Sequence, residues 1–323
     1  MGHQINGVDF LAGPREGFLT WHERPVNAAD YQCESLALAQ PAEAVRTAIV
    51  MQGALVAEMD FTLQTLVLYR RLYPQATLIL STWLDADPAL LDRARQLDVQ
   101  IVQSAKPAFA GQQNINLQIV TSAAGVLAAQ AGGATHILKT RTDQRLCAAN
   151  LPDYLHGLQQ SFPLRGASQQ QARLLAVSLN TFRYRMYGIS DMFLYGTADD
   201  MVRYWTPPLD TRVFDPDLRY FTNLREFAQW RVCEVYLCTE FLQRIGVAPA
   251  WTLQDYWRLM AERFCIVDAA SLDLFWPKYT TREQRWNKYD KSTLTHTELD
   301  FRSWMLLFSG LDRVEHYPEE RLG

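Results

Sequence analysis

The apolar residues between positions 47 and 138 alternate between short runs and longer amphipathic stretches. Runs of strand length cover 47–52, 77–81, 99–102 and 135–138. Between them, apolar side chains recur at helical spacing, and these stretches end before Pro74, near Leu97 and before Gly132. Strands that alternate with helices of this length are typical of a doubly wound, mostly parallel sheet with right-handed crossovers. The pattern therefore predicts an α/β fold of the Rossmann type, with helices flanking the sheet.

The pattern is less regular after residue 150. It predicts two further strands at 174–179 and 191–195, and helices at 198–205, 223–245 and 251–262. Asn223 and Glu226 have the spacing of a capping box at the start of the longest of these helices. The tail from Phe275 onward alternates aromatic and basic residues. This half is predicted to be a helical C-terminal elaboration of the same sheet.

The composition excludes several classes of protein. Hydrophobic residues make up 48% of the 323 residues, which is enough for a large core. The net charge is −4, and the sequence has no dominant basic stripe of the kind that binds nucleic acid. The N-terminus MGHQINGVDF has no secretory signal character, and no apolar run reaches the roughly 18 residues of a membrane span. Five scattered cysteines indicate free thiols in a reducing compartment. We expect a cytoplasmic protein.

The stretch at 134–145, Ala-Thr-His-Ile-Leu-Lys-Thr-Arg-Thr-Asp-Gln-Arg, joins a buried strand to a cluster of charge. Lys139, Arg141, Asp143 and Arg145 lie within seven residues, where open α/β sheets place their ligands. Asp143 is suited to holding Mg²⁺ or Mn²⁺ against a diphosphate. The three cations could instead contact phosphate directly. The alternative is an ordinary salt-bridge cluster at a strand end.

Polar residues also follow the first two strands and begin the third helix. These residues are Gln52, Gly53, Ser81, Thr82, Asp85, Asn114, Asn116 and Gln118. They are suited to binding a nucleoside base and ribose, although each could equally be a turn or cap residue.

Two carboxylates are candidates for activating an acceptor hydroxyl. Asp191 precedes a predicted strand, and Glu234 lies on a predicted helix among apolar neighbours. An inverting transferase needs a general base of this kind. Asp191 could otherwise be a helix or strand cap, and Glu234 could be one half of a structural ion pair.

A series of short motifs resembles the WavE lipopolysaccharide-synthesis family. They are Val50-Met-Gln-Gly53, Tyr73-Pro-Gln-Ala-Thr-Leu-Ile-Leu-Ser-Thr-Trp83, Asn114-Ile-Asn-Leu-Gln-Ile119, Ile137-Leu-Lys-Thr-Arg-Thr-Asp-Gln-Arg145, Ser190-Asp-Met-Phe-Leu-Tyr-Gly196, Cys233-Glu-Val-Tyr-Leu237 and Trp276-Pro-Lys-Tyr279. The resemblance implies a glycosyltransferase with a GT-A-like fold, in which Asp143 stands where such enzymes keep a metal-binding carboxylate. Arg141 occupies the first position of the usual Asp-x-Asp pair.

The resemblance implies transfer of a sugar from a nucleotide-activated donor to a lipopolysaccharide, O-antigen or capsule glycan. The acceptor would be a glycan or glycolipid, and the protein could contact the inner membrane peripherally. We expect a leader over 1–45 and a single domain over 46–323, with a nucleotide-binding half at 46–150 and an acceptor side at 151–323. The alternatives are a sugar nucleotidyltransferase, which would need a glycine-rich basic loop after the first strand, and a non-catalytic protein that binds glycans or nucleotides.

Overall fold

The computed structural model describes residues 45–166, 168–212, 223–276 and 297–310, together with the short antiparallel strands β1 (Gln4–Ile5) and β2 (Val8–Asp9). Its centre is a seven-stranded sheet in the order β10-β8-β9-β6-β3-β4-β5. The strands of this sheet are β3 (Thr47–Gln52), β4 (Thr77–Trp83), β5 (Gln100–Ser104), β6 (His136–Arg141), β8 (Leu174–Val177), β9 (Leu194–Thr197) and β10 (Phe264–Val267). Only β9 runs antiparallel to its neighbours, β6 and β8. The predicted α/β class with a mostly parallel sheet is confirmed.

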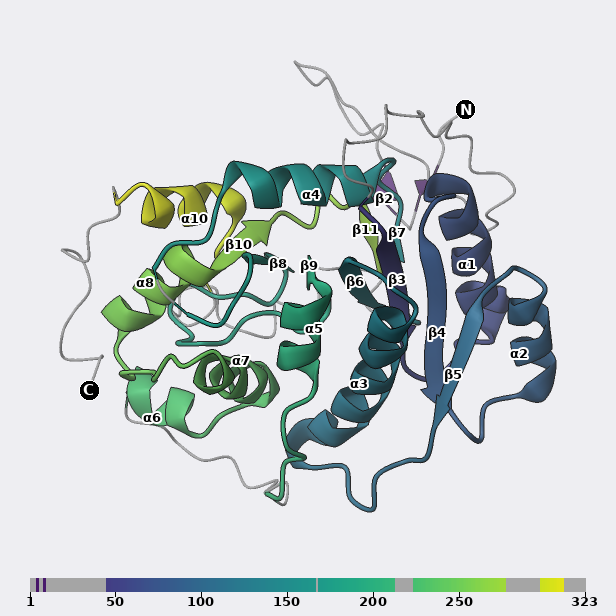
Figure 1. Ribbon diagram of the computed structural model, residues 1–323, viewed down its shortest axis with the longest axis horizontal. Coiled ribbons are helices and arrows are strands. Elements are labelled where there is room, and N and C mark those ends of the chain that lie inside the picture. Colours follow the sequence, from purple (N-terminus) through teal and green to yellow (C-terminus); the bar gives the residue numbers. More distant parts are fainter. Residues whose placement is uncertain are drawn as a thin grey trace.

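Helices flank this sheet along its whole width (Figure 1). They are α1 (Phe61–Leu72), α2 (Pro88–Arg95), α3 (Ile115–Ala131), α4 (Leu151–Ser161), α5 (Ala198–Trp205), α6 (Leu224–Gln229), α7 (Cys233–Arg244), α8 (Leu253–Arg263) and α10 (Phe301–Phe308). The crossovers β3–α1–β4 and β4–α2–β5 run outward, whereas β5–α3–β6 returns to the other side of β3. Because such crossovers are right-handed, α3 lies on the opposite face of the sheet from α1 and α2.

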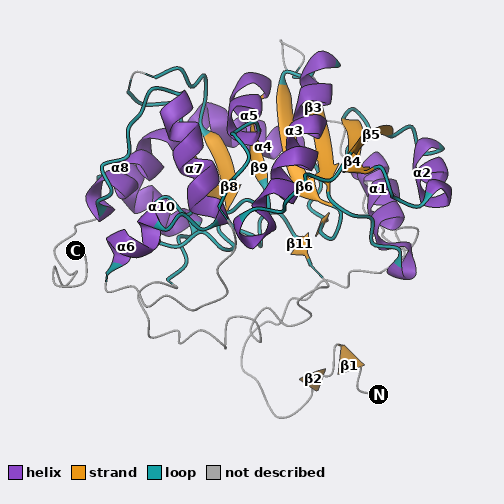
Figure 2. Cartoon of the chain, turned by 90° about the horizontal axis from the view of Figure 1, so that it is seen from below, coloured by secondary structure: helices purple, strands orange, loops and turns teal. Residues whose placement is uncertain are grey.

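Helix α3 packs unusually close to the sheet because of one glycine. A Cβ atom on Gly125 would lie 2.4 Å from Val50 Cγ1 and 3.0 Å from the Cβ of Ser81. No larger residue fits there without moving the helix, so Gly125 fixes the distance of α3 from β3 and β4. Helix α5 packs beside α3 (Figures 1 and 2), and the two helices cover the strands that lead into the charged turn after β6.

The C-terminal half differs from the sequence prediction in several places. The long helix expected at 223–245 is two helices, α6 and α7, because Arg231 takes a left-handed conformation (φ 55°) between them. The strand expected at 191–195 begins only at Leu194 and continues past Gly196 to Thr197. Helices α4 and α10 and strand β10 were not predicted, nor was the small antiparallel pair formed by β7 (Arg145–Leu146) and β11 (Leu274–Phe275).

Two predicted segments lie largely outside the described residues. They are the leader at 1–45, apart from β1 and β2, and the aromatic and basic tail beyond Trp276. Among the helices that the structure describes, none is both long enough and apolar enough to cross a lipid bilayer.

Candidate functional site

The carboxyl ends of β3 and β6 form the switch point of the sheet. The chain leaves β3 toward β4 on one side and returns to β6 on the other, which is where α/β sheets open a crevice for ligands. Gln52 lies opposite Ser81 of β4 and also opposite Arg141 of β6. Residues that are far apart in the sequence are therefore neighbours here, as the motif pattern predicted.

Gly53 makes the turn that follows β3. Its φ of +124° is strained for any other residue, and its N–H donates to the carbonyl of Ser81 at 3.0 Å. A Cβ on Gly53 would lie 3.0 Å from Thr142 Oγ1. Thr142 in turn donates its N–H to the carbonyl of Gln52 at 3.1 Å and its hydroxyl to that of Ala54 at 2.6 Å. The turns after β3 and β6 are thus bonded into one unit.

Arg141 and Asp143 form a two-point ion pair at this edge. Arg141 Nε donates to Asp143 Oδ1 at 2.8 Å and its Nη2 donates to Oδ2 at 2.9 Å. The two side chains keep 27% and 19% of their surfaces exposed. The Arg141 guanidinium also lies 5.6 Å from the centre of the Trp276 ring. This two-point geometry is the one by which arginine also binds phosphate.

Most of the polar residues at the end of β4 hold the scaffold together. Ser81 Oγ donates to the carbonyl of Thr121 on α3 at 2.6 Å, and Thr121 donates to Gln52 Oε1 at 2.8 Å. Thr82 is fully buried. Asp85 is exposed and paired with Lys106 at 2.6 Å. Gln52 and Ser81 therefore bind α3 to the sheet, and the nucleoside contacts predicted for these residues stay predictions.

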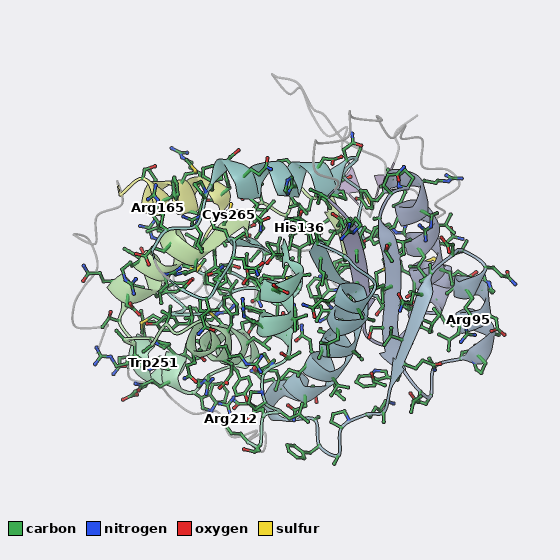
Figure 3. The ribbon with its side chains drawn as sticks, viewed as in Figure 1. Arg95, His136, Arg165, Arg212, Trp251 and Cys265 are labelled. Atoms are coloured by element: carbon green, nitrogen blue, oxygen red, sulfur yellow. The ribbon has the colours of Figure 1, made fainter. Side chains whose placement is uncertain are left out.

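The amides at the start of α3 serve different purposes. Asn116 is buried, accepts the N–H of Asp210 at 2.7 Å and donates to its carbonyl at 2.9 Å, so it clamps the segment after α5. Asn114 has a left-handed backbone (φ 64°) and makes no side-chain cap. Gln118 donates to the carbonyl of Asp191 at 3.2 Å. In Figure 3, the labelled Arg212 shows that the clamped segment lies at the lower edge, on the far side of α5 from His136.

Arg145 is bonded to the first turns of α1. Its Nε donates to Thr65 Oγ1 at 3.0 Å and its Nη2 to the carbonyl of Phe61 at 3.3 Å, and its guanidinium lies 4.5 Å from the Phe61 ring centre. The residue is only 3% exposed. Arg145 is therefore a buried link between β7 and α1, and its predicted contact with phosphate stays a prediction.

The two candidate bases, Asp191 and Glu234, act electrostatically on the same neighbouring side chains. The pKa of Cys233 is raised first by burial and then by the charges of Glu234 and Asp191, and the same two carboxylates raise the pKa of Tyr204. Both acids are therefore near the start of α7. Within the described residues, the carboxylate of Asp191 accepts no hydrogen bond.

Glu234 is held by two residues that the sequence prediction did not include. Asn180 Nδ2 donates to its carboxylate, and Arg185 Nη2 lies 3.9 Å from it. Both come from the basic and aromatic stretch at 180–188, which was recognised in composition but not connected with Glu234. The spacing offered no signal, because this contact depends on how β8 and α7 are packed.

Lys139 connects the two groups of charged residues. It is completely buried, and burial lowers its pKa to about 7 against the opposing effects of Asp191 and Asp143. Arg141 lowers the pKa further. Asp143, Arg141, Lys139 and Asp191 therefore share one electrostatic neighbourhood along β6.

Comparison with known proteins identifies the family. A family model described as WavE lipopolysaccharide synthesis matches residues 47–312. The chain belongs to this family. The description of the family links its members to lipopolysaccharide synthesis. The matched residues include the ends of β3 and β6 and both candidate bases.

Other comparisons add less. No curated protein matches the sequence significantly. Among solved structures, the apo form of mouse xyloside xylosyltransferase 1 aligns with 69% of this WavE chain and 85% of its own, at 12% identity and a TM-score of 0.32. That likeness is too low to bear on activity.

The donor set at the switch point limits how a divalent cation could bind. Asp143 is the carboxylate nearest the end of β6, and no group of three His, Cys, Asp or Glu side chains in the described part of the chain could hold a metal ion. The described residues therefore offer no site built from protein ligands alone. A cation held by one carboxylate together with the phosphates of a substrate does fit, since Mg²⁺ is commonly bound in this way.

Proposed function

We propose that this WavE family member is a glycosyltransferase that moves a sugar from a nucleotide-activated donor to a growing lipopolysaccharide, O-antigen or capsule glycan. The observation that carries the proposal is the Arg141–Asp143 pair at the switch point between β3 and β6. The leaving group of such a reaction is a nucleoside diphosphate, whose growing negative charge must be stabilised. Arg141 would bind its oxygens by two parallel hydrogen bonds.

Asp143 would exchange its partner when the donor binds. Arg141 would turn to the diphosphate, and the Asp143 carboxylate would then be available to hold a divalent cation. The cation would supply positive charge to the leaving group. The remaining ligands would come from phosphate oxygens and water, as the donor set requires.

Asp191 is the better candidate for the base in an inverting reaction. The carboxylate of Glu234 is already engaged by Asn180 and Arg185. The carboxylate of Asp191 accepts no hydrogen bond within the described residues. Asp191 would remove the proton of the acceptor hydroxyl, and Glu234 would orient the acceptor. A cytoplasmic site at the inner membrane would suit a lipid-linked acceptor.

The test is release of nucleoside diphosphate from a panel of nucleotide sugars, with and without added Mn²⁺ or Mg²⁺. Asp143→Ala and Arg141→Ala are each expected to lower kcat/KM by about 100-fold. Asp60→Ala is a matched control, because Asp60 forms a two-point pair with Arg93 (2.9 and 2.6 Å) on the surface between α1 and α2. Turnover that is unchanged in Asp143→Ala would refute the assignment.

The alternatives give different products. A sugar nucleotidyltransferase would release pyrophosphate from a nucleoside triphosphate, and a non-catalytic binding protein would show a thermal shift with nucleotide sugars but no turnover. Chelation by EDTA separates the two ways of neutralising the diphosphate. Activity lost on chelation and restored by Mn²⁺ would support the cation, whereas activity that survives would leave Arg141 as the principal charge.

A further inference from the structure

Lys139 is a buried cation in the middle of the sheet, where a charge is costly unless it is bonded. Its ammonium group donates to the backbone carbonyl of Asp191 and lies 4.2 Å from the centre of the Trp205 ring. The side chain is 0% exposed. It therefore cannot reach a ligand in solution as the sequence suggested, and its bonding capacity is directed at the chain segment that carries Asp191.

A second side chain reaches the same carbonyl. Gln118 Nε2, from α3, donates to it at 3.2 Å, so two donors from two different elements converge on one oxygen atom. The segment at 188–193 has neither helix nor strand structure. It is tied down by side chains instead, since the N–H of Ser190 also donates to Thr181 Oγ1 at 3.0 Å.

We infer that Lys139 and Gln118 are positioning residues that fix the place of Asp191 relative to the diphosphate-binding end of β6. The inference rests on the proposed function, because it takes Asp191 as the group that acts on the acceptor. Lys139 and Arg141 are two residues apart on the same strand, so they project from the same face of β6. A single strand would thus set the distance between the donor phosphates and the base.

The experiment compares transfer kinetics of Lys139→Met and Gln118→Met with the wild type. Both variants should lower kcat by about 10- to 100-fold while the donor KM stays within about threefold, because a misplaced base slows the chemical step without loosening the donor. Lys139→Ala should regain part of its activity with added propylamine.

The matched control is Gln130→Ala. Gln130 lies on the same helix as Gln118, but its amide donates to Asp199 at 2.7 Å at the other end of α3. Its kinetics should equal those of the wild type. If Lys139→Met raises the donor KM more than tenfold with kcat unchanged, Lys139 acts on the donor and the inference is wrong.

A second readout does not depend on activity. Hydrogen exchange of the amides at 188–193 should speed up at least tenfold in Lys139→Met and Gln118→Met but not in Gln130→Ala. Unchanged exchange in both variants would overturn the positioning role even in an active enzyme. Faster exchange in a protein that turns over no nucleotide sugar would refute the glycosyltransferase and leave the structural coupling intact. If Lys139→Met does not fold, Gln118→Met decides, since Gln118 is partly exposed on α3.

Discussion

Replacing Gly53 by alanine tests whether the turn after β3 holds the switch point together. The φ of Gly53 is +124°, in a region that residues with a Cβ atom rarely adopt, and such strain costs about 1–3 kcal/mol. The added Cβ would also lie 3.0 Å from Thr142 Oγ1, so that hydroxyl must shift by a few tenths of an ångström. We expect Gly53→Ala to lower the free energy of unfolding by about 1–3 kcal/mol.

Urea unfolding followed by circular dichroism measures this loss. With a slope of about 3 kcal/mol per molar urea, the midpoint should fall by about 0.3–1 M. Gly157→Ala is the control, because Gly157 lies within α4 and a Cβ there would meet no atom within 4 Å. Alanine at that helical position should leave the protein as stable or up to about 1 kcal/mol more stable.

A double variant separates the two contributions. Thr142→Ala removes the hydroxyl that faces Gly53 and also its 2.6 Å bond to the Ala54 carbonyl. If the contact matters, the loss in Gly53→Ala/Thr142→Ala should be smaller than the sum of the two single losses. If the free energy of unfolding of Gly53→Ala differs from that of the wild type by less than about 0.3 kcal/mol, the smallest difference such comparisons resolve, the reasoning is refuted.

Three further outcomes are expected. Arg145→Leu should lower the free energy of unfolding by about 1–3 kcal/mol, because Thr65 and Phe61 lose a buried hydrogen-bond partner. The donor KM should stay unchanged. A tenfold rise in the donor KM would instead show that Arg145 contributes to donor binding. Asn116→Ala should cost a similar amount, about 1–3 kcal/mol, and speed hydrogen exchange at Asp210, and exchange at the wild-type rate would contradict the clamp. Burial lowers the pKa of His136 from 6.5 to about 4, so between these pH values the unfolded chain binds more protons than the folded protein. The melting temperature should therefore fall as the pH drops from 6.5 to about 4. An equal fall of the melting temperature in His136→Asn would disprove this.

The central strands and their helices were predictable because each strand is buried on both faces and reads as a continuous apolar run. β3, β4 and β6 were located to within a few residues for this reason. The break between α6 and α7 was not, because it contains neither glycine nor proline. Arg231 adopts its left-handed backbone there with its side chain bonded to Thr239 at 3.0 Å and Glu240 at 2.7 Å, and these tertiary contacts are invisible in the local pattern.

The candidate site was predictable as a location but not in the use of each side chain. Ligands of α/β sheets bind at the carboxyl ends of the strands, and Arg141 and Asp143 lie together at such an end, at the switch point. Arg145, four residues after Arg141, bonds to Thr65 and Phe61 of α1, and it lies on β7, which pairs with β11, a strand more than a hundred residues away in the sequence. Lys139 and Asn116 likewise bind backbone carbonyls of distant segments, which no spacing rule indicates.

The place of β9 in the sheet has a consequence for how the chain can be divided. β9 covers the outer edge of β6, with Lys139 paired to Leu194, and is itself bonded to β8. A fragment that stops near residue 150 would bare the hydrogen-bonding edge of β6, an invitation to intermolecular pairing. The strands before residue 150 therefore depend on β9 and β8 to complete the sheet at the edge of β6.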